Sequence, residues 1–327
     1  MNVSIIGTGS YLPERILTND DLAKTVDTSD EWIFTRTGIR QRHIARDGEA
    51  TSDMGAVAAQ RALESAGIRP TDIGMIIVAT STPDMCFPNT ACLIQNRIGA
   101  VNAFCFDMEA ACSGFLFAME TARRFVESGA VATALVVGAE KFSCITDWTD
   151  RDTCVLFGDG AGAVVIRRSD HGKGMMSAVL RSDGRLSDAL KVECSGSRSQ
   201  AGYQGDSSGC GRPRIRMNGR EVFKHAVLSM TESIREALDK SGLTAADIDW
   251  EIPHQANVRI LESVNSKLGI PMEKCCLNLH NVGNISAASV PVALDEAVRA
   301  GLIKRGHKLL FVVAGAGFTW GAAVMEW

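Results

Sequence analysis

Short apolar runs alternate along the chain with longer segments of helical periodicity. The runs are rich in β-branched residues and predict buried strands at residues 3–9, 73–80, 134–140, 162–168 and 308–317. Two further segments, 51–66 and 221–241, place apolar residues on one face of a helix. Strands that alternate with helices predict an α/β protein whose sheets are covered on both faces.

The second half of the chain repeats features of the first. The stretch ALESAGIRPTDIGMIIVA begins at Ala62, and a similar stretch, ALDKSGLTAADIDWEIPH, begins at Ala237, an offset of 175 residues. Two shorter matches occur at nearly the same offset. Such matches are typical of a duplicated unit, so we expect two similar halves, residues 1–170 and 171–327.

Composition narrows the class of protein. The 327-residue chain is 46% hydrophobic and 22% charged, with a net charge of −4. The length suffices for a large core, and the weakly acidic balance argues against a general nucleic-acid binder. A membrane span and a secretory signal peptide are not expected, because the chain has neither a run of about 18 apolar residues nor a basic, apolar N-terminus. A cytoplasmic location is therefore predicted.

Cysteine spacing and glycine motifs predict no metal or nucleotide cofactor. The ten cysteines include no CxxC pair, and most lie among apolar neighbours, as expected of buried free thiols in a reducing compartment. Residues 157–166, FGDGAGAVVI, lead into a strand rather than a helix, so a tight turn is the better interpretation. The polar, Gly- and Ser-rich segment 194–213 predicts a long surface loop.

One cysteine lies at a junction suited to chemistry. Cys112 stands in DMEAACSGFLFAM, residues 107–119, where small residues precede an apolar helical stretch. If a helix begins there, its N-terminal end lowers the pKa of the thiol and favours a nucleophilic thiolate. The alternative is an inert buried cysteine.

Two further candidate site residues are more convincing as a pair than singly. His254 follows a predicted strand in IPHQANVRI, and Asn284 lies in HNVGNISAAS. Taken alone, the first is as well explained by a structural histidine and the second by a turn or cap. Asn284 lies at about the position of Cys112 in the duplicated register, so a two-fold repeat would bring all three residues to one central site.

The motifs resemble one family. Its three active-site motifs are similar to ACSGF, PHQANVRI and GNISAASVPVALDEA in this chain, which is therefore identified as a member of the β-ketoacyl-acyl-carrier-protein synthase III family. The resemblance extends to WIFTRTGIRQRHIA, FGDGAGAVV and GAGFTWGAA and covers nearly the whole sequence. It implies the thiolase fold, with two duplicated halves in α-β-α-β-α layers, and a homodimer.

The resemblance also implies the reaction, an acyl transfer that starts fatty acid synthesis without a cofactor. Cys112 would accept the acyl group of an acyl-CoA, normally acetyl-CoA, and malonyl-acyl carrier protein would then lose CO₂ and attack the acyl-cysteine. His254 and Asn284 would donate hydrogen bonds to the enolate, and the backbone N–H groups of Cys112 and Ala316 would hold the other oxyanion.

Substrate contacts are expected by the same resemblance. The coenzyme A contacts would be Trp32, Arg36, Arg151 and Asn257, and the acyl pocket would involve Ala314 and, reaching in from the partner, Phe87. Ala314 stands where the family often has a large aromatic residue. Acyl carrier proteins are strongly acidic, and the cationic residues expected to dock one are Lys224, Arg259 and Lys267. The alternative for all of these is an ordinary core or solvated role.

Other functions on the same fold stay open. An acyltransferase that does not condense, or a condensing enzyme of polyketide or secondary metabolism, would use Cys112 in the same way. A thiolase is disfavoured, because GAGFTWG has no second cysteine to serve as a base. A non-catalytic acyl-carrier-binding subunit is disfavoured by the presence of Cys112.

Overall fold

The computed structural model describes residues 2–169, 172–198 and 211–327 and contains two main sheets. The first has the order β1-β7-β6-β4-β5 and consists of β1 (Val3–Tyr11), β4 (Met75–Ala79), β5 (Phe104–Met108), β6 (Thr133–Lys141) and β7 (Asp159–Arg168). The second has the order β11-β12-β13-β8 and consists of β8 (Gly174–Ser182), β11 (Trp250–Pro253), β12 (Lys308–Gly315) and β13 (Thr319–Glu326). All five strands predicted from the sequence are confirmed.

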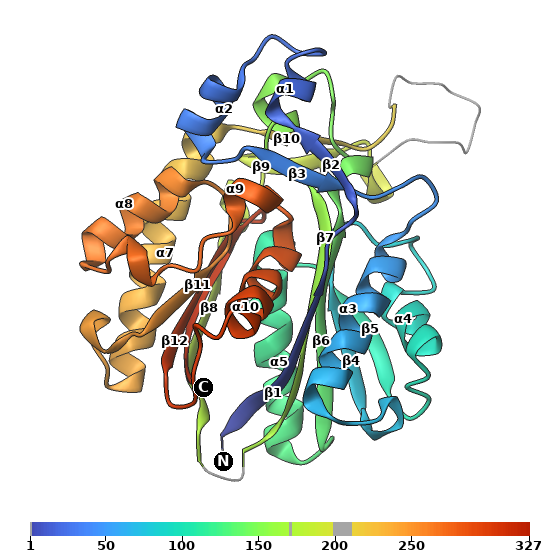
Figure 1. The fold of residues 1–327 in the computed structure, drawn as a ribbon, viewed down its shortest axis with the longest axis vertical. Coiled ribbons are helices and arrows are strands. Elements are labelled where there is room, and N and C mark those ends of the chain that lie inside the picture. The colour runs from blue at the N-terminus through green and yellow to red at the C-terminus, as the bar shows by residue number, and fades with distance from the viewer. Residues whose placement is uncertain (1, 170–171, 199–210) are drawn as a thin grey trace.

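Helices form three layers around the two sheets (Figure 1). The outer face of the first sheet is covered by α3 (Thr51–Ala66) and α4 (Thr90–Ile98), and that of the second by α7 (Gly219–Ser241) and α8 (Val258–Leu268). Between the sheets lie α5 (Gly114–Ser128) and α10 (Ser289–Arg299), whose apolar residues join both sheets in one core. The predicted α/β fold with α-β-α-β-α layers is therefore confirmed.

Burial on both faces explains why the strands are continuously apolar. Every residue of β4 is buried, and so are all but the end residues of β6. One face of each of these two strands packs on the outer helices and the other on the central pair, so they show no alternation of polar residues. The central packing is close: a Cβ on Gly138 of β6 would lie 2.4 Å from the carbonyl oxygen of Ala287.

The same elements recur in both halves of the chain. Strand β11, helix α10 and strand β12 each begin 175 residues after β4, α5 and β6. The order β1-β7-β6-β4 of the first sheet corresponds to β8-β13-β12-β11 in the second. Ala111 and Ser286, also 175 residues apart, both adopt left-handed backbone, with φ of 46° and 48°. These correspondences support the proposal that residues 1–170 and 171–327 are duplicated halves.

Smaller elements gather at one end of the molecule (Figure 1). They are two antiparallel pairs, β2 (Arg15–Thr18) with β3 (Gln41–Ile44) and β9 (Leu190–Glu193) with β10 (Arg214–Met217), and the short helices α1 (Asn19–Leu22), α2 (Asp30–Thr37), α6 (Arg151–Cys154) and α9 (Leu279–Val282). A separate apolar cluster that includes Leu22, Phe142 and Ile215 holds them together. The central part of the predicted loop 194–213 lies outside the described residues.

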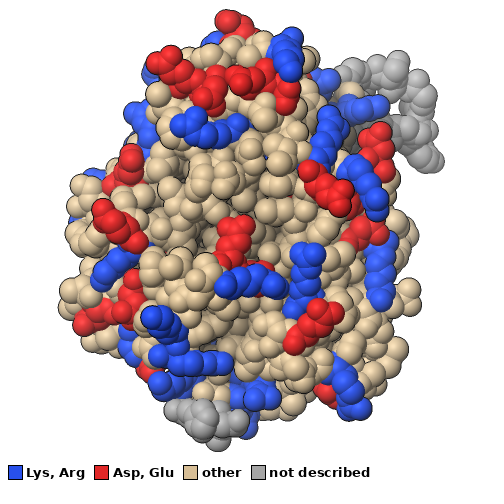
Figure 2. All heavy atoms as spheres, viewed as in Figure 1, with Lys and Arg blue, Asp and Glu red and all other residues tan. Residues whose placement is uncertain are grey.

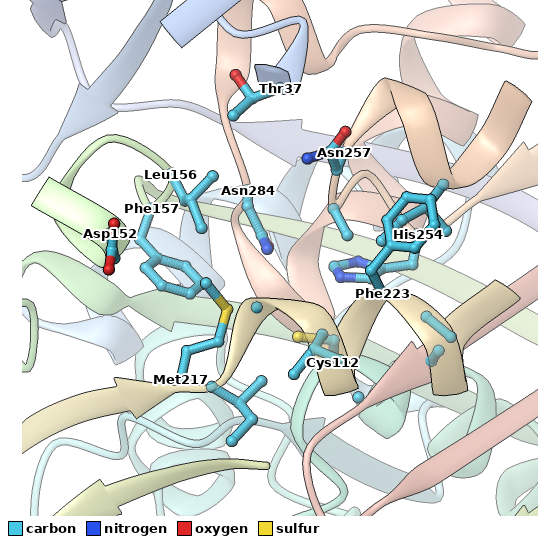
Figure 3. Close-up of a pocket in the computed structure, with 18 of the residues that line it drawn as sticks. Thr37, Cys112, Asp152, Leu156, Phe157, Met217, Phe223, His254, Asn257 and Asn284 are labelled. Atoms are coloured by element: carbon cyan, nitrogen blue, oxygen red, sulfur yellow. The ribbon is translucent and has the colours of Figure 1, made fainter. Parts of the chain in front are cut away.

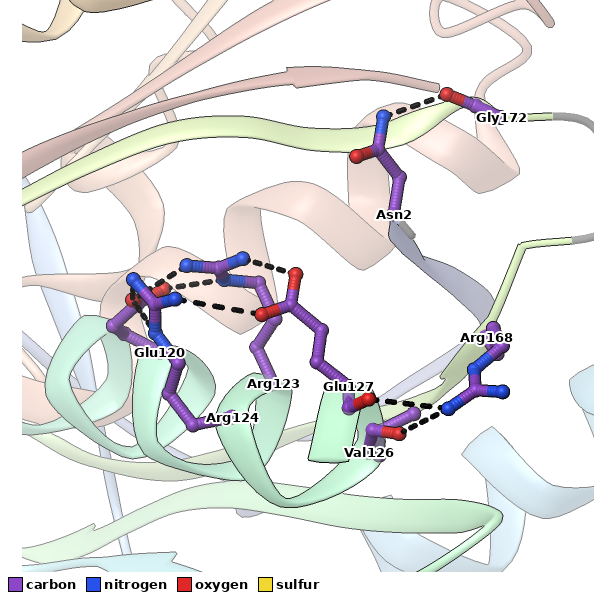
Figure 4. Close-up of polar contacts among 8 residues, drawn as sticks. All are labelled: Asn2, Glu120, Arg123, Arg124, Val126, Glu127, Arg168 and Gly172. Atoms are coloured by element: carbon purple, nitrogen blue, oxygen red, sulfur yellow. Dashed lines mark hydrogen bonds and ion pairs between the residues drawn. The ribbon is translucent and has the colours of Figure 1, made fainter. Parts of the chain in front are cut away.

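Charged side chains fix the end of the central helix α5 (Figure 4). Arg123 forms ion pairs with Glu120, at 2.6 Å, and with Glu127. Arg168, at the end of β7, donates hydrogen bonds to the carbonyl oxygens of Val126 and Glu127 at 3.5 and 3.1 Å. A cation at these terminal carbonyls is favourable because they carry the negative end of the helix dipole.

The cysteines differ in part from the expectation. Eight are described as free thiols, but only three of these are buried, and Cys86 and Cys144 are exposed. Cys194 is disulfide-bonded. Apolar neighbours in the sequence do not ensure burial, because the direction of a side chain depends on its face: Cys105 lies on the edge strand β5 and is half-buried.

The surface and the described side chains agree with the composition. Positive and negative groups are interspersed on the face shown in Figure 2, and the net charge of the chain is small, −4. Among residues 2–169, 172–198 and 211–327, no helix is long and apolar enough to cross a membrane. The same residues include no cluster of His, Cys, Asp or Glu that could hold a metal ion.

A buried carboxyl group in β11 should make stability depend on pH. Glu251 is fully buried, and its Oε2 accepts a hydrogen bond of 2.6 Å from Asn265. Burial raises the pKa of Glu251 to about 7. The folded state thus holds this proton more tightly than the unfolded chain, so the stabilisation is complete below about pH 4.5 and is lost as the pH rises through about 7.

The unfolding free energy of the unaltered protein should fall between pH 5 and pH 8 as Glu251 ionises. In Glu251→Gln this residue cannot ionise, so the fall should be smaller, by about 3 kcal/mol at most. Urea unfolding at both pH values measures this difference. The matched control is Glu262→Gln on α8, where the glutamate is exposed. If the unfolding free energies of the two variants depended equally on pH, the conclusion that Glu251 is neutral in the folded protein at pH 5 would be wrong.

Candidate active site

Cys112 sits in a tight turn between the first sheet and the central helix. Strand β5 ends at Met108, a 3-10 turn covers Ala111–Ser113, and α5 begins at Gly114, as the small residues predicted. Ala111 adopts the left-handed conformation, and its N–H donates to Glu109 Oε1 at 2.8 Å. The cysteine is 5% exposed, so the turn presents a nearly buried thiol at the N-terminus of α5.

The pKa of this thiol differs from the sequence-based expectation. Burial raises the pKa of Cys112 to about 12, and a contact with the Ser286 hydroxyl only partly opposes that effect. The loss of water around the sulfur thus acts against the lowering of the pKa that is expected from the N-terminus of α5. In the free protein Cys112 is a thiol, and a nucleophilic role requires a group that accepts its proton.

His254 comes directly after β11 and is 3% exposed. Its Nδ1 lies 2.7 Å from the hydroxyl oxygen of Ser289, in the first turn of α10. Burial lowers the pKa of His254 to about 3, so the imidazole is neutral. The next residue, Gln255, holds the loop in place, because its Oε1 accepts hydrogen bonds from the N–H groups of Asn278 and Leu279.

Asn284 is 6% exposed and is fixed by its own amide. Its Oδ1 accepts a hydrogen bond of 2.9 Å from the N–H of Ser286, which leaves its NH₂ group free to face the cavity. Its backbone N–H donates a hydrogen bond to the carbonyl oxygen of Leu156 at 2.9 Å, and its carbonyl oxygen accepts one from the N–H of Gly158 at 3.0 Å. The FGDG stretch is thus a turn into β7, as expected, and it positions Asn284.

One cavity of about 200 Å³ joins the three candidate residues. Cys112, His254 and Asn284 all line it, and in Figure 3 their side chains point toward a common region. They come from three junctions, after β5, after β11 and after α9, that lie far apart in the sequence. The structure therefore brings together the residues that the motifs singled out.

Three of the four residues expected to contact coenzyme A lie at the outer part of the same cavity. Trp32, Arg36 and Asn257 line it, whereas Arg151 does not. The guanidinium carbons of Arg36 and Arg151 lie 4.6 and 4.8 Å from the centre of the Trp32 ring. Asn257 caps α8 and donates to the carbonyl oxygen of Arg36 at 3.0 Å. An aromatic ring between two cations marks this end of the cavity.

A second cavity of about 380 Å³ also reaches Cys112. Its apolar lining includes Phe142, Phe157, Leu190, Val192 and Ile215, and Ala316 borders it as well. Cys112 and Ala316, whose backbone N–H groups are expected to hold an oxyanion, thus both line this cavity. Glycine is needed at position 315, because a Cβ there would lie 2.7 Å from the backbone nitrogen of Cys112.

The two residues expected at the acyl pocket lie apart. Ala314 lines the first cavity, next to Phe318 and His254, and not the second. Phe87 is 85% exposed and lines neither cavity of its own chain. The three expected docking residues, Lys224 on α7 and Arg259 and Lys267 on α8, are all exposed.

Sequence reasoning missed three buried polar residues beside the site. Glu140, at the end of β6, accepts hydrogen bonds from the Ser81 N–H and the Thr82 hydroxyl, and burial raises its pKa to about 7. The Ser286 hydroxyl, which interacts with both Cys112 and Glu140, has no well-aligned hydrogen bond among the described residues. Ser289 contacts His254. All three are polar residues inside otherwise apolar stretches of the sequence, and that pattern is the signal by which sequence reasoning could have found them.

Known proteins match the chain along its length. A family model described as 3-oxoacyl-[acyl-carrier-protein] synthase III matches residues 106–184. A second model, described as the C terminal of that synthase, matches residues 238–327. A protein of Clostridium acetobutylicum named β-ketoacyl-[acyl-carrier-protein] synthase III is 52% identical over 326 residues, which cover 100% of this chain and 99% of the relative. One of the same name from Paramagnetospirillum magneticum is also 52% identical, with 98% of each chain covered.

Solved structures share the architecture. The crystal structure of 3-oxoacyl-[acyl-carrier-protein] synthase III from Aquifex aeolicus is 47% identical, with a TM-score of 0.93 and complete coverage of both chains. The priming β-ketosynthase of the R1128 polyketide pathway is 38% identical, with a TM-score of 0.94 and coverage of 99% and 96%. The protein is thus a thiolase-fold condensing enzyme, an acyltransferase. The chain belongs to the β-ketoacyl-acyl-carrier-protein synthase III family.

Proposed function

We propose that the protein starts fatty acid synthesis by joining the acyl group of an acyl-CoA, acetyl-CoA first of all, to malonyl-acyl carrier protein through an acyl-Cys112 intermediate. The observation that carries the proposal is the first cavity, which leads from Trp32 and Arg36 to Cys112, His254 and Asn284. Family membership supports the reaction type, and the cavity supports these residues as the ones that perform it.

In the first half-reaction Cys112 attacks the thioester carbonyl carbon of the acyl-CoA. The buried thiol, whose pKa is raised to about 12, is not ionised beforehand, so its proton moves as the S–C bond forms. His254 lines the same cavity and accepts this proton, and the positive charge that the imidazole gains is balanced by the oxyanion formed in the same step. The carbonyl oxygen becomes an oxyanion that the N–H groups of Cys112 and Ala316 stabilise. Coenzyme A leaves with the proton, and the acyl group remains on sulfur.

In the second half-reaction malonyl-acyl carrier protein occupies the same cavity. Loss of CO₂ places negative charge on the thioester oxygen, and hydrogen-bond donors at that oxygen lower the barrier. The NH₂ group of Asn284 is oriented for this role by its bond to Ser286, and His254 adds an N–H. The carbanion then attacks the acyl carbon, a C–C bond forms, and the bond from that carbon to the Cys112 sulfur breaks. The thiolate that leaves takes a proton from solvent and returns to the thiol.

Coenzyme A would bind at the outer end of the first cavity. The adenine ring would stack near Trp32, and the guanidinium groups of Arg36 and Arg151, which flank the indole, would contact phosphates. Asn257 would contact the pantetheine arm, because it lines the cavity between this end and His254. The acyl chain would extend from Cys112 into the second, apolar cavity.

A homodimer is proposed from the edge of the first sheet. Strand β5 is the last in its sheet, and its outer edge has no partner strand among the described residues. The nearby side chains Phe87 and Phe104 are 85% and 46% exposed. An exposed edge with large apolar groups favours pairing with a second copy, whose second cavity would receive Phe87.

Ala314→Phe should narrow the choice of primer. The new ring would enter the first cavity, where about 200 Å³ is available, and would narrow the path by which an acyl group reaches Cys112 from the outer end of that cavity, so longer acyl groups would suffer first. We expect the ratio of kcat/KM for hexanoyl-CoA to that for acetyl-CoA to fall several-fold. Ala314→Val, a smaller change, should have an intermediate effect. An unchanged ratio would show that residue 314 does not border the path of the acyl group.

Arg259→Glu should weaken use of the acidic carrier protein. Arg259 is exposed in the first turn of α8, two residues after the cavity residue Asn257. We expect KM for malonyl-acyl carrier protein to rise several-fold, with a smaller effect on acetylation by acetyl-CoA. High salt should weaken carrier use by the unaltered protein, because the Debye length shrinks to about 3 Å at 1 M.

The control for this docking test is Lys304→Glu. Lys304 is also an exposed cation, and it precedes β12, at the end of that strand remote from Gly315. Lys267→Glu tests whether the surface extends along α8. If Arg259→Glu and Lys304→Glu give the same carrier kinetics and the same salt dependence, the docking surface lies elsewhere.

Incubation of the protein with acetyl-CoA and malonyl-acyl carrier protein tests the proposed function. We expect one CO₂ and one acetoacetyl-carrier per turnover, measured by gas release and intact mass. Acyl transfer without CO₂ would indicate an acyltransferase that does not condense. A panel of acyl-CoA primers then addresses a polyketide role, which the similarity to the R1128 priming ketosynthase makes the second candidate.

A further inference from the structure

The hydrogen bonds of Ser289 determine which nitrogen of His254 carries the proton. Ser289 Oγ lies 2.7 Å from His254 Nδ1 and 2.7 Å from the carbonyl oxygen of Ser286. A hydroxyl group has one proton, and a carbonyl oxygen can only accept. The Ser289 proton must lie toward the Ser286 carbonyl, since two oxygens at this distance need a proton between them. Nδ1 therefore donates to Ser289 Oγ.

Two other observations agree with this assignment. The N–H of Gln255 also points to Ser289 Oγ, at 3.5 Å, so that oxygen acts as an acceptor on this side. Burial lowers the pKa of His254 to about 3, so the ring has a single proton. With that proton on Nδ1, Nε2 has a lone pair. Ser289 is 1% exposed and His254 3%, so water has little access to this arrangement.

We infer that Ser289 is a positioning residue: it holds the His254 proton on Nδ1 in the free enzyme and makes Nε2 the proton acceptor for Cys112. This inference rests on the proposed function. As the bond between Cys112 sulfur and the acyl carbon forms, the thiol proton moves to Nε2. When the bond to the coenzyme A sulfur breaks, that proton passes to the leaving thiolate. The ring returns to its neutral form with Nδ1 protonated.

The condensation half-reaction makes the opposite demand on His254. An enolate oxygen needs an N–H donor, and a neutral ring provides one only when its proton is on Nε2. Nδ1 is then an acceptor, and the Ser289 hydroxyl must turn from the Ser286 carbonyl to donate to it. The change is a proton shift within a neutral ring and a rotation of one hydroxyl group, so no charge is added to the buried cavity.

Ser289→Ala should therefore affect the two half-reactions unequally. Without Ser289 Oγ, an Nδ1 proton would be buried without an acceptor, which is unfavourable, whereas an Nε2 proton faces the cavity. The ring should change to the Nε2-protonated form. We expect acetylation of Cys112 by acetyl-CoA to slow by about tenfold or more. Loss of CO₂ from malonyl-carrier on pre-acetylated enzyme should slow much less.

The matched control is Ser233→Ala in α7. Ser233 is 2% exposed, and its hydroxyl donates to the Met230 carbonyl oxygen at 3.1 Å, so it resembles Ser289 in burial and bonding but has no hydrogen bond to a histidine among the described residues. It should leave both half-reactions unchanged. Equal losses in Ser289→Ala and Ser233→Ala would indicate a general packing effect and overturn the inference.

Imidazole ¹⁵N spectra test the proton position without any turnover. His254→Ala identifies the His254 signals among those of the six histidines. We expect protonated Nδ1 in the unaltered enzyme and protonated Nε2 in Ser289→Ala. Protonated Nε2 in the unaltered enzyme would overturn the inference even if Ser289→Ala failed to fold. Failure of the unaltered enzyme to acetylate Cys112 would instead refute the proposed function, so the two failures are distinguishable.

Discussion

Cys112→Ser should abolish formation of the acyl-enzyme while the fold is retained. The hydroxyl is nearly the same size as the thiol, but it is a far weaker acid, and in a site that already raises the pKa of a thiol to about 12 it will not ionise. We expect acetylation to fall by about 10³-fold or more. Intact mass after incubation with acetyl-CoA should show one added acetyl group in the unaltered protein and none in the variant.

The control is Cys144→Ser, which changes an exposed free cysteine and should leave the acetyl adduct in place. The melting temperatures of Cys112→Ser and the unaltered protein should agree within a few degrees, since no volume is lost. Acetylation of Cys112→Ser at the normal rate would show that another residue is the nucleophile.

His254→Ala and Asn284→Ala should separate the half-reactions. Both variants retain Cys112 and should still accept an acetyl group, His254→Ala more slowly because it lacks the proton acceptor. Both should lose decarboxylation of malonyl-acyl carrier protein by about 10²-fold or more, the usual effect of removing one donor from a developing oxyanion. CO₂ release from pre-acetylated enzyme measures this step alone.

Asn284→Asp provides a sharper version of the same test. Aspartate keeps an oxygen that can accept the hydrogen bond from the Ser286 N–H, but it replaces the NH₂ donor by a second oxygen. If the donor matters, this variant should be as defective in CO₂ release as Asn284→Ala. Normal CO₂ release from any of the three variants would mean that the enolate charge is stabilised elsewhere.

Local patterns in the sequence were enough to predict the main elements. A strand or helix is recognised by the period of its apolar residues, which depends only on neighbours along the chain. Continuous apolar runs such as 73–80 therefore predicted the buried strand β4. In the same way, small residues followed by an apolar helical stretch correctly placed Cys112 just before α5.

Motifs also predicted which residues meet. Cys112, His254 and Asn284 lie in separate motifs, and the 175-residue echo suggested that their junctions converge. The structure places all three residues on one cavity, although no local pattern in the sequence specifies how close together they lie. Exposure was less predictable: Phe87 and Ala314 were expected near one acyl pocket, but where each side chain faces depends on packing between layers. The roles of these residues remain predictions.

The sequence by itself determined the α/β elements, the order of the motifs and the residue types that can perform acyl transfer. Only the tertiary structure decided their protonation. The pKa of Cys112 is raised because layers from both halves exclude water from it, against the effect of its own helix. The His254 proton is placed by Ser289, 35 residues away in the chain. Burial and hydrogen bonding act through space, so they follow from which surfaces pack together and not from neighbours in the sequence.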